Sequence, residues 1–154
     1  MRFLLIDDIV DMVPGLTIAA VKTLAADAEI FRDHFPGFPV VPGVLLIEMM
    51  AQAAGKCLDA EDADRGKAML VQVRHASFRQ WVRPDERADI AARITLSTPV
   101  SAMASCVIQV GDRTVADAHL VFAFVPRSRL AEHFTDEVLE RYLTGRAASG
   151  ERQE

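Results

Sequence analysis

Two residues that can exchange protons, His34 and Glu48, stand fourteen positions apart in a stretch that is otherwise almost entirely apolar. Histidine changes its charge near neutral pH, which makes it the commonest general base in proteins. A carboxyl group within an apolar helix loses its water and needs a hydrogen bond or a proton in return. Gln52 follows Glu48 by four positions and therefore lies on the same helical face. We take His34 and Glu48 as a candidate acid–base pair, with Gln52 orienting the carboxyl group.

The residues that must position this pair are a loop and the helix that follows it. The loop contains Pro36-Gly37 and ends at Pro42-Gly43, and an apolar run then continues to Leu58. A helix that is apolar nearly all the way round is expected to be enclosed by the rest of the fold. Its first turn has backbone N–H groups without helical partners and the positive end of the helix dipole. Such a helix start can therefore bind a carbonyl oxygen that gains negative charge.

This segment resembles the signature of the FabZ-type 3-hydroxyacyl-[acyl-carrier-protein] dehydratases. The resemblance rests on the run from His34 to Gly37, the run from Pro42 to Leu45, and Glu48 with Met50-Ala51-Gln52, including the His–Glu spacing. It implies an α+β hotdog fold, in which an antiparallel β-sheet wraps around a long central helix. It also implies site roles for a set of residues: catalytic His34 and Glu48, oxyanion-binding Gly43 and Val44, and supporting Gln52, Phe35, Pro36, Gly37 and Pro42.

The resemblance further implies a reaction and an assembly. The substrate would be a (3R)-3-hydroxyacyl chain on the phosphopantetheine arm of an acyl carrier protein, and the product its trans-2-enoyl thioester, in fatty acid, polyketide or aryl-polyene synthesis. No other cofactor is implied. Which proton His34 moves and which Glu48 moves stays open. The family's site takes its histidine from one subunit and its acid from the other, so we expect a homodimer with its sheets side by side, or three such dimers.

Two departures from the family pattern bear on specificity. The family's tunnel-gating aromatic aligns with Met69 or Leu70, so the gate and the acyl chain length are left open. The usual Pro-Gly-Asp turn reads Pro84-Asp85-Glu86, so that turn should differ. We expect a hotdog domain over residues 1–126, followed by an amphipathic helix and a frayed tail over 127–154.

Composition limits the classes of function. The chain has 154 residues, of which 51% are hydrophobic, which suits a single domain with a sizeable core. Its net charge of −5 argues against a nucleic-acid binder, and no run is long enough to span a membrane. Asp7, Asp8 and Asp11 come too early for a signal peptide, so we expect a cytoplasmic protein.

Neither the cysteines nor the histidines have the spacing of metal ligands. Cys57 and Cys106 are isolated and are expected to be reduced core thiols, so no metal is predicted. The basic stretch 65–83 lacks acidic residues. It is either a solvated strand edge or a docking patch for an acidic carrier protein, made of Arg65, Lys67, Arg74, Arg79 and Arg83.

Alternating apolar residues outside the central helix predict an antiparallel sheet. The predicted strands cover residues 3–6, 16–24, 68–82, 89–97, 104–110 and 114–125. Residues 25–33 can be a short helix or a loop, and residues 59–66 should form a polar connection that ends the central helix. Apolar residues at helical spacing predict a last helix over 127–144, stopped by Gly145.

Three other functions fit parts of the pattern. A hotdog thioesterase would hydrolyse a similar substrate, but it usually places its carboxylate differently. An isomerising FabA-type dehydratase would have Asp at the position of Glu48. A non-catalytic carrier-binding module would retain the fold alone, with His34 as an ordinary loop residue and Glu48 bonded to a backbone N–H.

Overall fold

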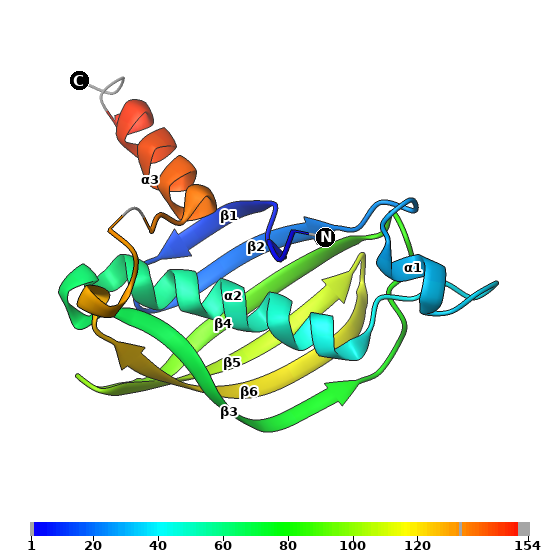
Figure 1. Cartoon of the computed structure of the whole chain (residues 1–154), viewed down its shortest axis with the longest axis horizontal. Helices are drawn as coiled ribbons and strands as arrows, with labels where there is room; N and C mark the ends of the chain where they lie inside the picture. Colours follow the sequence, from blue (N-terminus) through cyan, green and yellow to red (C-terminus); the bar gives the residue numbers. More distant parts are fainter. Residues whose placement is uncertain (1, 133, 151–154) are drawn as a thin grey trace.

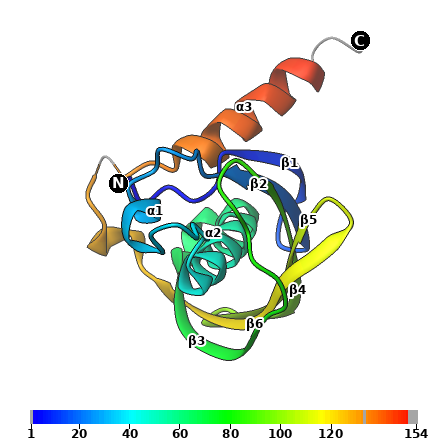
Figure 2. The same ribbon diagram turned by 90° about the vertical axis from the view of Figure 1, so that its right-hand side faces the viewer.

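The computed structural model describes residues 2–132 and 134–150 and contains one long helix, α2 (Gly43–Glu61), wrapped by an antiparallel sheet (Figures 1 and 2). The sheet has six strands in the order β1-β2-β4-β5-β6-β3. The strands are β1 (Asp8–Val13), β2 (Thr17–Thr23), β3 (Lys67–Phe78), β4 (Arg87–Ser97), β5 (Ser101–Val110) and β6 (Arg113–Val125). The predicted α+β hotdog architecture is confirmed.

The core lies between α2 and the concave face of the sheet. Met49, Met50 and Leu58 of the helix are fully buried there, against Ile90, Ile108 and Phe122 of the strands among others. The alternation predicted for β5 and β6 holds, since Ala104, Cys106, Ile108, Ala116, Ala118, Leu120 and Phe122 are buried. The helix is less enclosed than predicted, because the sheet wraps only part of it and Val44 in its first turn is 71% exposed (Figure 2).

The first predicted strand is wrong. Residues 3–6 form no strand, although Leu5 and Ile6 are buried, and β1 begins only at Asp8. The backbone of this segment pairs instead with a side chain of the central helix: the Leu5 N–H donates to Gln52 Oε1 at 2.9 Å. A buried segment can satisfy its backbone in this way without a neighbouring strand.

The polar connection after the central helix also begins later than predicted. The helix α2 runs on to Glu61 and therefore includes Asp59, which is buried. The Asp59 carboxylate accepts the Ala68 N–H and pairs with Lys67, so its charge is satisfied inside the fold. A short 3₁₀ turn, Ala63–Arg65, then leads into β3.

The predicted C-terminal helix over 127–144 is placed too early. Residues Arg127–Arg129 form a 3₁₀ turn, and the helix α3 spans Glu137–Gly150, through Gly145. Asp136 begins the helix, since its carboxylate accepts the Leu139 N–H at 3.0 Å as an N-cap does. Of the predicted frayed tail, residues 147–150 are helical and 151–154 lie outside the described residues.

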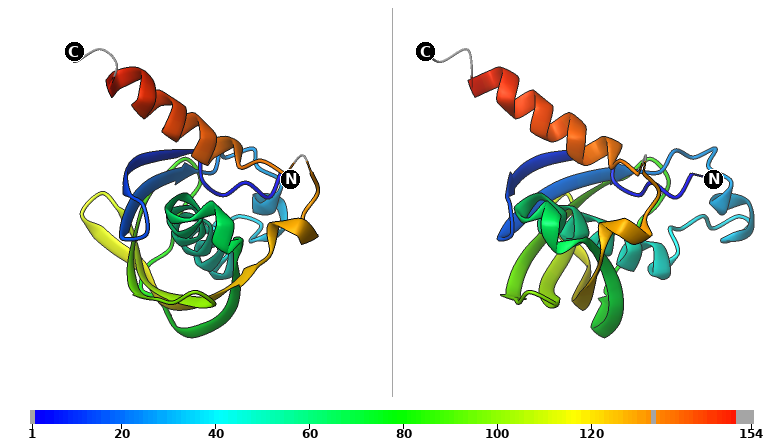
Figure 3. Two further views of the ribbon diagram at one scale, coloured as in Figure 1. Left: turned by 90° about the vertical axis from the view of Figure 1, so that its left-hand side faces the viewer. Right: turned by 60° about the vertical axis from the view of Figure 1, so that its left-hand side comes forward.

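The helix α3 packs on β1, one edge of the sheet, and its far end projects away from the body (Figure 3). Val138 and Leu139 are its buried side chains. Arg141 and Arg146 donate to the carbonyls of Asp7 and Met12 near the two ends of β1. Across the part of the chain that the structure describes, no helix is long and apolar enough to cross a membrane.

Candidate active site

His34 lies at the end of the short helix α1 (Ile30–Asp33), in the loop that precedes α2. Its ring Nδ1 is 3.1 Å from the Val40 carbonyl oxygen, and the ring stacks on Phe35 with centroids 4.0 Å apart. A carbonyl can only accept, so the Nδ1 atom carries the proton, and in the neutral form of the ring the lone pair is on Nε2. The loop therefore fixes both the orientation and the tautomer that a general base needs.

Hydrogen bonds within the loop explain this fixed position. The Val40 N–H donates back to the His34 carbonyl at 3.0 Å, and Phe35 and Phe38 exchange two backbone hydrogen bonds. Gly37 has a φ of +78°, a conformation that suits the turn between those two residues and that other residues rarely adopt. Phe35 is half exposed, so its side chain contributes to the loop surface rather than to the core.

Glu48 and Gln52 lie together on the face of α2 that borders a pocket of about 660 Å³. Gln52 Nε2 donates to Glu48 Oε1 at 3.0 Å, as the spacing of these residues predicts. The same amide donates to the Phe3 carbonyl at 3.1 Å, while its oxygen accepts the Leu5 N–H. Gln52 thus links the carboxyl group to the N-terminal segment and fixes its orientation.

The start of α2 presents the backbone donors that the sequence indicated. Pro42 is the N-cap residue, and Gly43 and Val44 follow in the first turn, where N–H groups lack helical acceptors. A Cβ atom on Gly43 would lie 3.1 Å from the Phe78 ring, which is a tight contact. Glycine leaves room for that ring, since a side chain at this position would require the ring to shift by a few tenths of an ångström.

The chain brings together some of the predicted site residues and leaves others apart. Glu48 and Gln52 share the pocket, whereas His34, Phe35 and the Gly43 backbone lie outside its lining. Within the described part of the chain, no hydrogen bond or ion pair joins His34 to Glu48. His34 and Glu48 therefore lie in separate surroundings within the chain, each with its own supporting contacts.

Two buried ion pairs at the pocket were not predicted from the sequence. Lys56 contacts Asp136 with 2.6 Å between Nζ and Oδ2, and Lys67 pairs with Asp59. The signal that could have indicated them is the lysine itself, since Lys56 interrupts a run of apolar and small residues in α2. Among the described residues, no group of three or more His, Cys, Asp or Glu is arranged to bind a metal ion.

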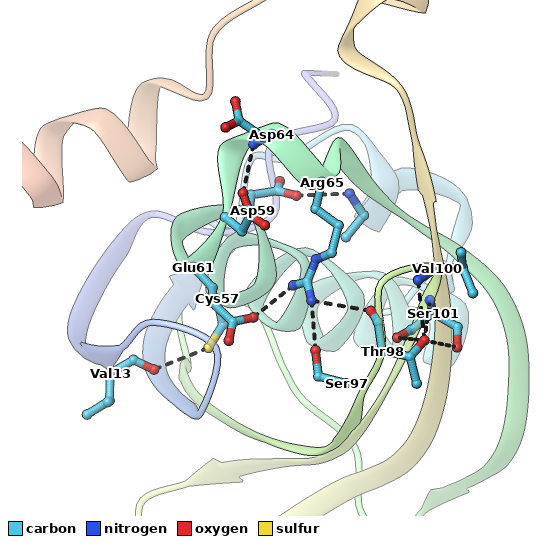
Figure 4. A network of polar contacts seen from close by, with 12 residues as sticks. Val13, Cys57, Asp59, Glu61, Asp64, Arg65, Ser97, Thr98, Val100 and Ser101 are labelled. Carbon is cyan, nitrogen blue, oxygen red and sulfur yellow. Dashed lines mark hydrogen bonds and ion pairs between the residues drawn. The ribbon is translucent and has the colours of Figure 1, made fainter.

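The basic stretch divides into internal and outward side chains. Arg65 binds Glu61 and Ser97 at 2.8 Å each (Figure 4). Its guanidinium group lies over the Phe124 ring, and its side chain is only 11% exposed. Lys67 is bound to Asp59, with 19% exposure. Arg79 pairs with Asp117 but remains 56% exposed. Arg65 and Lys67 therefore serve the fold and the pocket.

Comparisons with known proteins agree with this architecture. The family model described as FabA-like domain matches residues 1–119. The 3-hydroxyacyl-[acyl-carrier-protein] dehydratase FabZ of Enterococcus faecalis is 35% identical over 121 residues, covering 78% of this chain and 86% of that protein. The FabZ of Campylobacter hominis is 43% identical over 89 residues, covering 55% of this chain and 61% of that protein.

A solved structure, the dehydratase heterocomplex ApeI:P from Xenorhabdus doucetiae, has the same fold. Its TM-score is 0.66 at 19% identity, covering 83% of this chain and 87% of that one. At this identity the similarity to the solved structure concerns the fold alone. The family model and the FabZ relatives match this chain in sequence as well. The chain belongs to the FabA-like family and, within it, to the FabZ-type 3-hydroxyacyl-[acyl-carrier-protein] dehydratases.

Proposed function

We propose that this protein is a hydro-lyase that converts a (3R)-3-hydroxyacyl thioester on an acyl carrier protein to the trans-2-enoyl thioester. The observation that carries the proposal is the pair of oriented proton carriers: His34 with Nε2 free, and Glu48 held by Gln52 at the pocket. The substrate class follows the names of the FabZ relatives. The reaction needs no cofactor beyond the carrier's phosphopantetheine arm, and it would serve cytoplasmic fatty acid synthesis or a related polyketide or aryl-polyene pathway.

In this elimination, His34, Glu48 and the backbone N–H groups at the start of α2 each perform one step. His34 Nε2 removes a proton from C2, the electron pair forms the C2–C3 double bond, and the C3–O bond breaks. Glu48 gives its proton to the departing hydroxyl, which leaves as water. The N–H groups of Gly43 and Val44 bind the thioester oxygen while it carries negative charge. Each positioned acid or base contributes on the order of 10²–10⁴-fold to the rate.

His34 and Glu48 would form one site only in a dimer. The edges of the sheet favour one arrangement of the two subunits. Strand β3 is a free edge with exposed apolar side chains, namely Met69, Leu70, Val71, Val73 and Phe78. Long apolar edges pair with another strand when they can. The opposite edge, β1, is contacted by α3. Pairing of two β3 strands would join the sheets side by side, with His34 of one subunit facing Glu48 of the partner subunit.

Carrier recognition is assigned to the outward arginines. The side chains of Arg74, Arg79 and Arg83 are exposed. The Arg83 guanidinium carbon lies 6.0 Å from the centre of the Phe38 ring. An acidic carrier protein would be attracted to this side, mainly through a faster association. Arg65 and Lys67 are left out of the docking patch because their charges are bound internally.

The function is tested by hydration of a crotonyl thioester, followed at the enoyl-thioester absorbance band together with a free-thiol assay. Loss of the band without thiol release is expected, and His34→Ala and Glu48→Gln should each abolish it. His119→Ala and Glu132→Gln, at exposed positions, are the matched controls and should be fully active. Thiol release would instead indicate a thioesterase. Carrier binding without turnover would indicate a non-catalytic module.

A further inference from the structure

The pocket beside Glu48 extends along α2 and ends at charged groups. Glu48 and Gln52 border one end, and Lys56 and Asp136 border the other. Lys56 lies eight positions after Glu48 in the helix, which corresponds to about 12 Å at the helical rise. Between them the helix presents Ala51, Gln52 and Gly55 to the pocket. The other walls are mainly apolar and come from Phe3, Ala68, Met69, Leu70, Phe122 and Phe134.

The charges at the far end are buried and paired. The Lys56 and Asp136 side chains are 7% and 15% exposed, with 2.6 Å between Nζ and Oδ2. Lys67 also borders this end and pairs with Asp59, whose side chain is 3% exposed. Burying such pairs carries a large desolvation penalty, so they are weak evidence for stability. The chemistry proposed for His34 and Glu48 does not use them either.

The Lys56–Asp136 pair connects two parts of the chain that are eighty residues apart. Asp136 also caps α3 by accepting the Leu139 N–H, so one carboxylate both begins that helix and binds α2. The segment 134–137 thereby becomes a wall of the pocket. This wall comes from beyond residue 119, where the match to the FabA-like model ends.

We infer that segment 134–137, held by the Lys56–Asp136 ion pair, closes the far end of the acyl pocket and limits the acyl chain length. The inference rests on the proposed function, in which C2 and C3 of the acyl chain lie at Glu48. The carbons beyond C3 then extend past Ala51 and Gly55 toward the ion pair. A hydrocarbon end that reached Lys56 and Asp136 would remove their remaining water without offering a hydrogen bond. The pocket therefore accepts chains that end before the ion pair and rejects longer ones.

The test is the kcat/KM profile over 3-hydroxyacyl-pantetheine thioesters from 3-hydroxybutyryl to 3-hydroxypalmitoyl. The first variant combines Lys56→Met with Asp136→Asn, which removes both charges together and keeps an oxygen for the Leu139 N–H. The second, Gly55→Val, narrows the pocket before the ion pair. The control, Arg87→Gln with Asp89→Asn, removes an exposed ion pair on β4.

The two variants should shift the profile in opposite directions. A methylene that a pocket accepts or excludes changes kcat/KM by roughly tenfold or more. The double variant should raise the long-chain to short-chain ratio by at least about that factor, Gly55→Val should lower it, and the control should keep the wild-type ratio. A wild-type profile without a length limit would overturn the inference, as would profiles unchanged in both variants. If the double variant does not fold, the kcat/KM profile of Gly55→Val alone provides the test.

Calorimetric binding of saturated acyl-pantetheine thioesters separates this inference from the proposed function. A length limit in binding, shifted by the same variants but without turnover of any hydroxyacyl thioester, would support the closed pocket and refute the dehydratase. Turnover of substrates of all chain lengths with equal kcat/KM would support the dehydratase and refute the closed pocket. The binding series therefore tests the closed pocket independently of the chemistry.

Discussion

Gln52 is the residue whose replacement tests the geometry of the site most sharply, because it bonds to three groups at once. Its oxygen accepts the Leu5 N–H, and its nitrogen donates to the Phe3 carbonyl and to Glu48 Oε1. Leu5 is 1% exposed, so in Gln52→Leu its N–H loses its partner in a buried place, which costs roughly 1–3 kcal/mol. The two other bonds add about 0.5–1.5 kcal/mol each.

The expected loss for Gln52→Leu is therefore roughly 2–6 kcal/mol in the free energy of unfolding, compared with the 5–15 kcal/mol typical of a domain. The variant should fold and show a reduced urea midpoint. Its kcat for crotonyl thioester hydration should fall by about 10- to 100-fold, since the Glu48 carboxyl group is no longer oriented. Gln109→Leu, at an exposed position of β5, is the control and should stay within about 0.5 kcal/mol of wild type.

Gln52→Glu separates the structural part from the catalytic part. A glutamate can still accept the Leu5 N–H, but it has no N–H to donate to Glu48 or to the Phe3 carbonyl. Stability should therefore recover in part while activity stays low. Urea unfolding and enoyl absorbance measured on the same samples check this. A Gln52→Leu variant that matches the Gln109→Leu control in both stability and kcat would refute the orienting role of Gln52.

Three further predictions concern pH, thiol reactivity and carrier docking. Burial alone would raise the pKa of Asp136, but hydrogen bonds from Lys56 and a backbone N–H outweigh it and lower that pKa. The stabilising contribution of Asp136 should thus be complete above about pH 5 and disappear as the pH falls through the lowered pKa. In acid, the free energies of unfolding of wild type and Asp136→Asn, measured in urea, should therefore become equal. Burial raises the pKa of Cys106 to about 12, so a disulfide reagent should label it only after unfolding; labelling of the native protein would contradict this burial. Arg74→Ala with Arg83→Ala should raise KM for a carrier-linked substrate and leave KM for a small thioester unchanged, and equal effects on both would exclude docking there.

The sequence predicted those parts of the fold that local patterns determine. Alternation in β5 places Ala104, Cys106 and Ile108 inside, and four-residue spacing joins Glu48 to Gln52. Long-range partners explain the errors. The apolar segment before β1 pairs its backbone with Gln52, forty-seven residues away from Leu5, so it needs no neighbouring strand.

The C-terminal helix was misplaced for a related reason. Apolar residues recur at helical spacing from Leu130 onward, but the helix begins where Asp136 caps it. That carboxylate also binds Lys56, a partner that no local pattern could indicate. His34 and Glu48 carry the sequence signal of one site, yet no hydrogen bond or ion pair joins them among the described residues. Only the proposed second subunit would complete the site.

A site shared between subunits is tested most directly by mixing the inactive variants His34→Ala and Glu48→Gln. After subunits are exchanged by mild urea and dilution, half of the dimers contain one chain of each kind. In these dimers one of the two sites has both His34 and Glu48 intact, so hydration of a crotonyl thioester should return to roughly a quarter of wild-type activity. No recovery, despite mixed dimers demonstrated by mass spectrometry, would contradict the shared site.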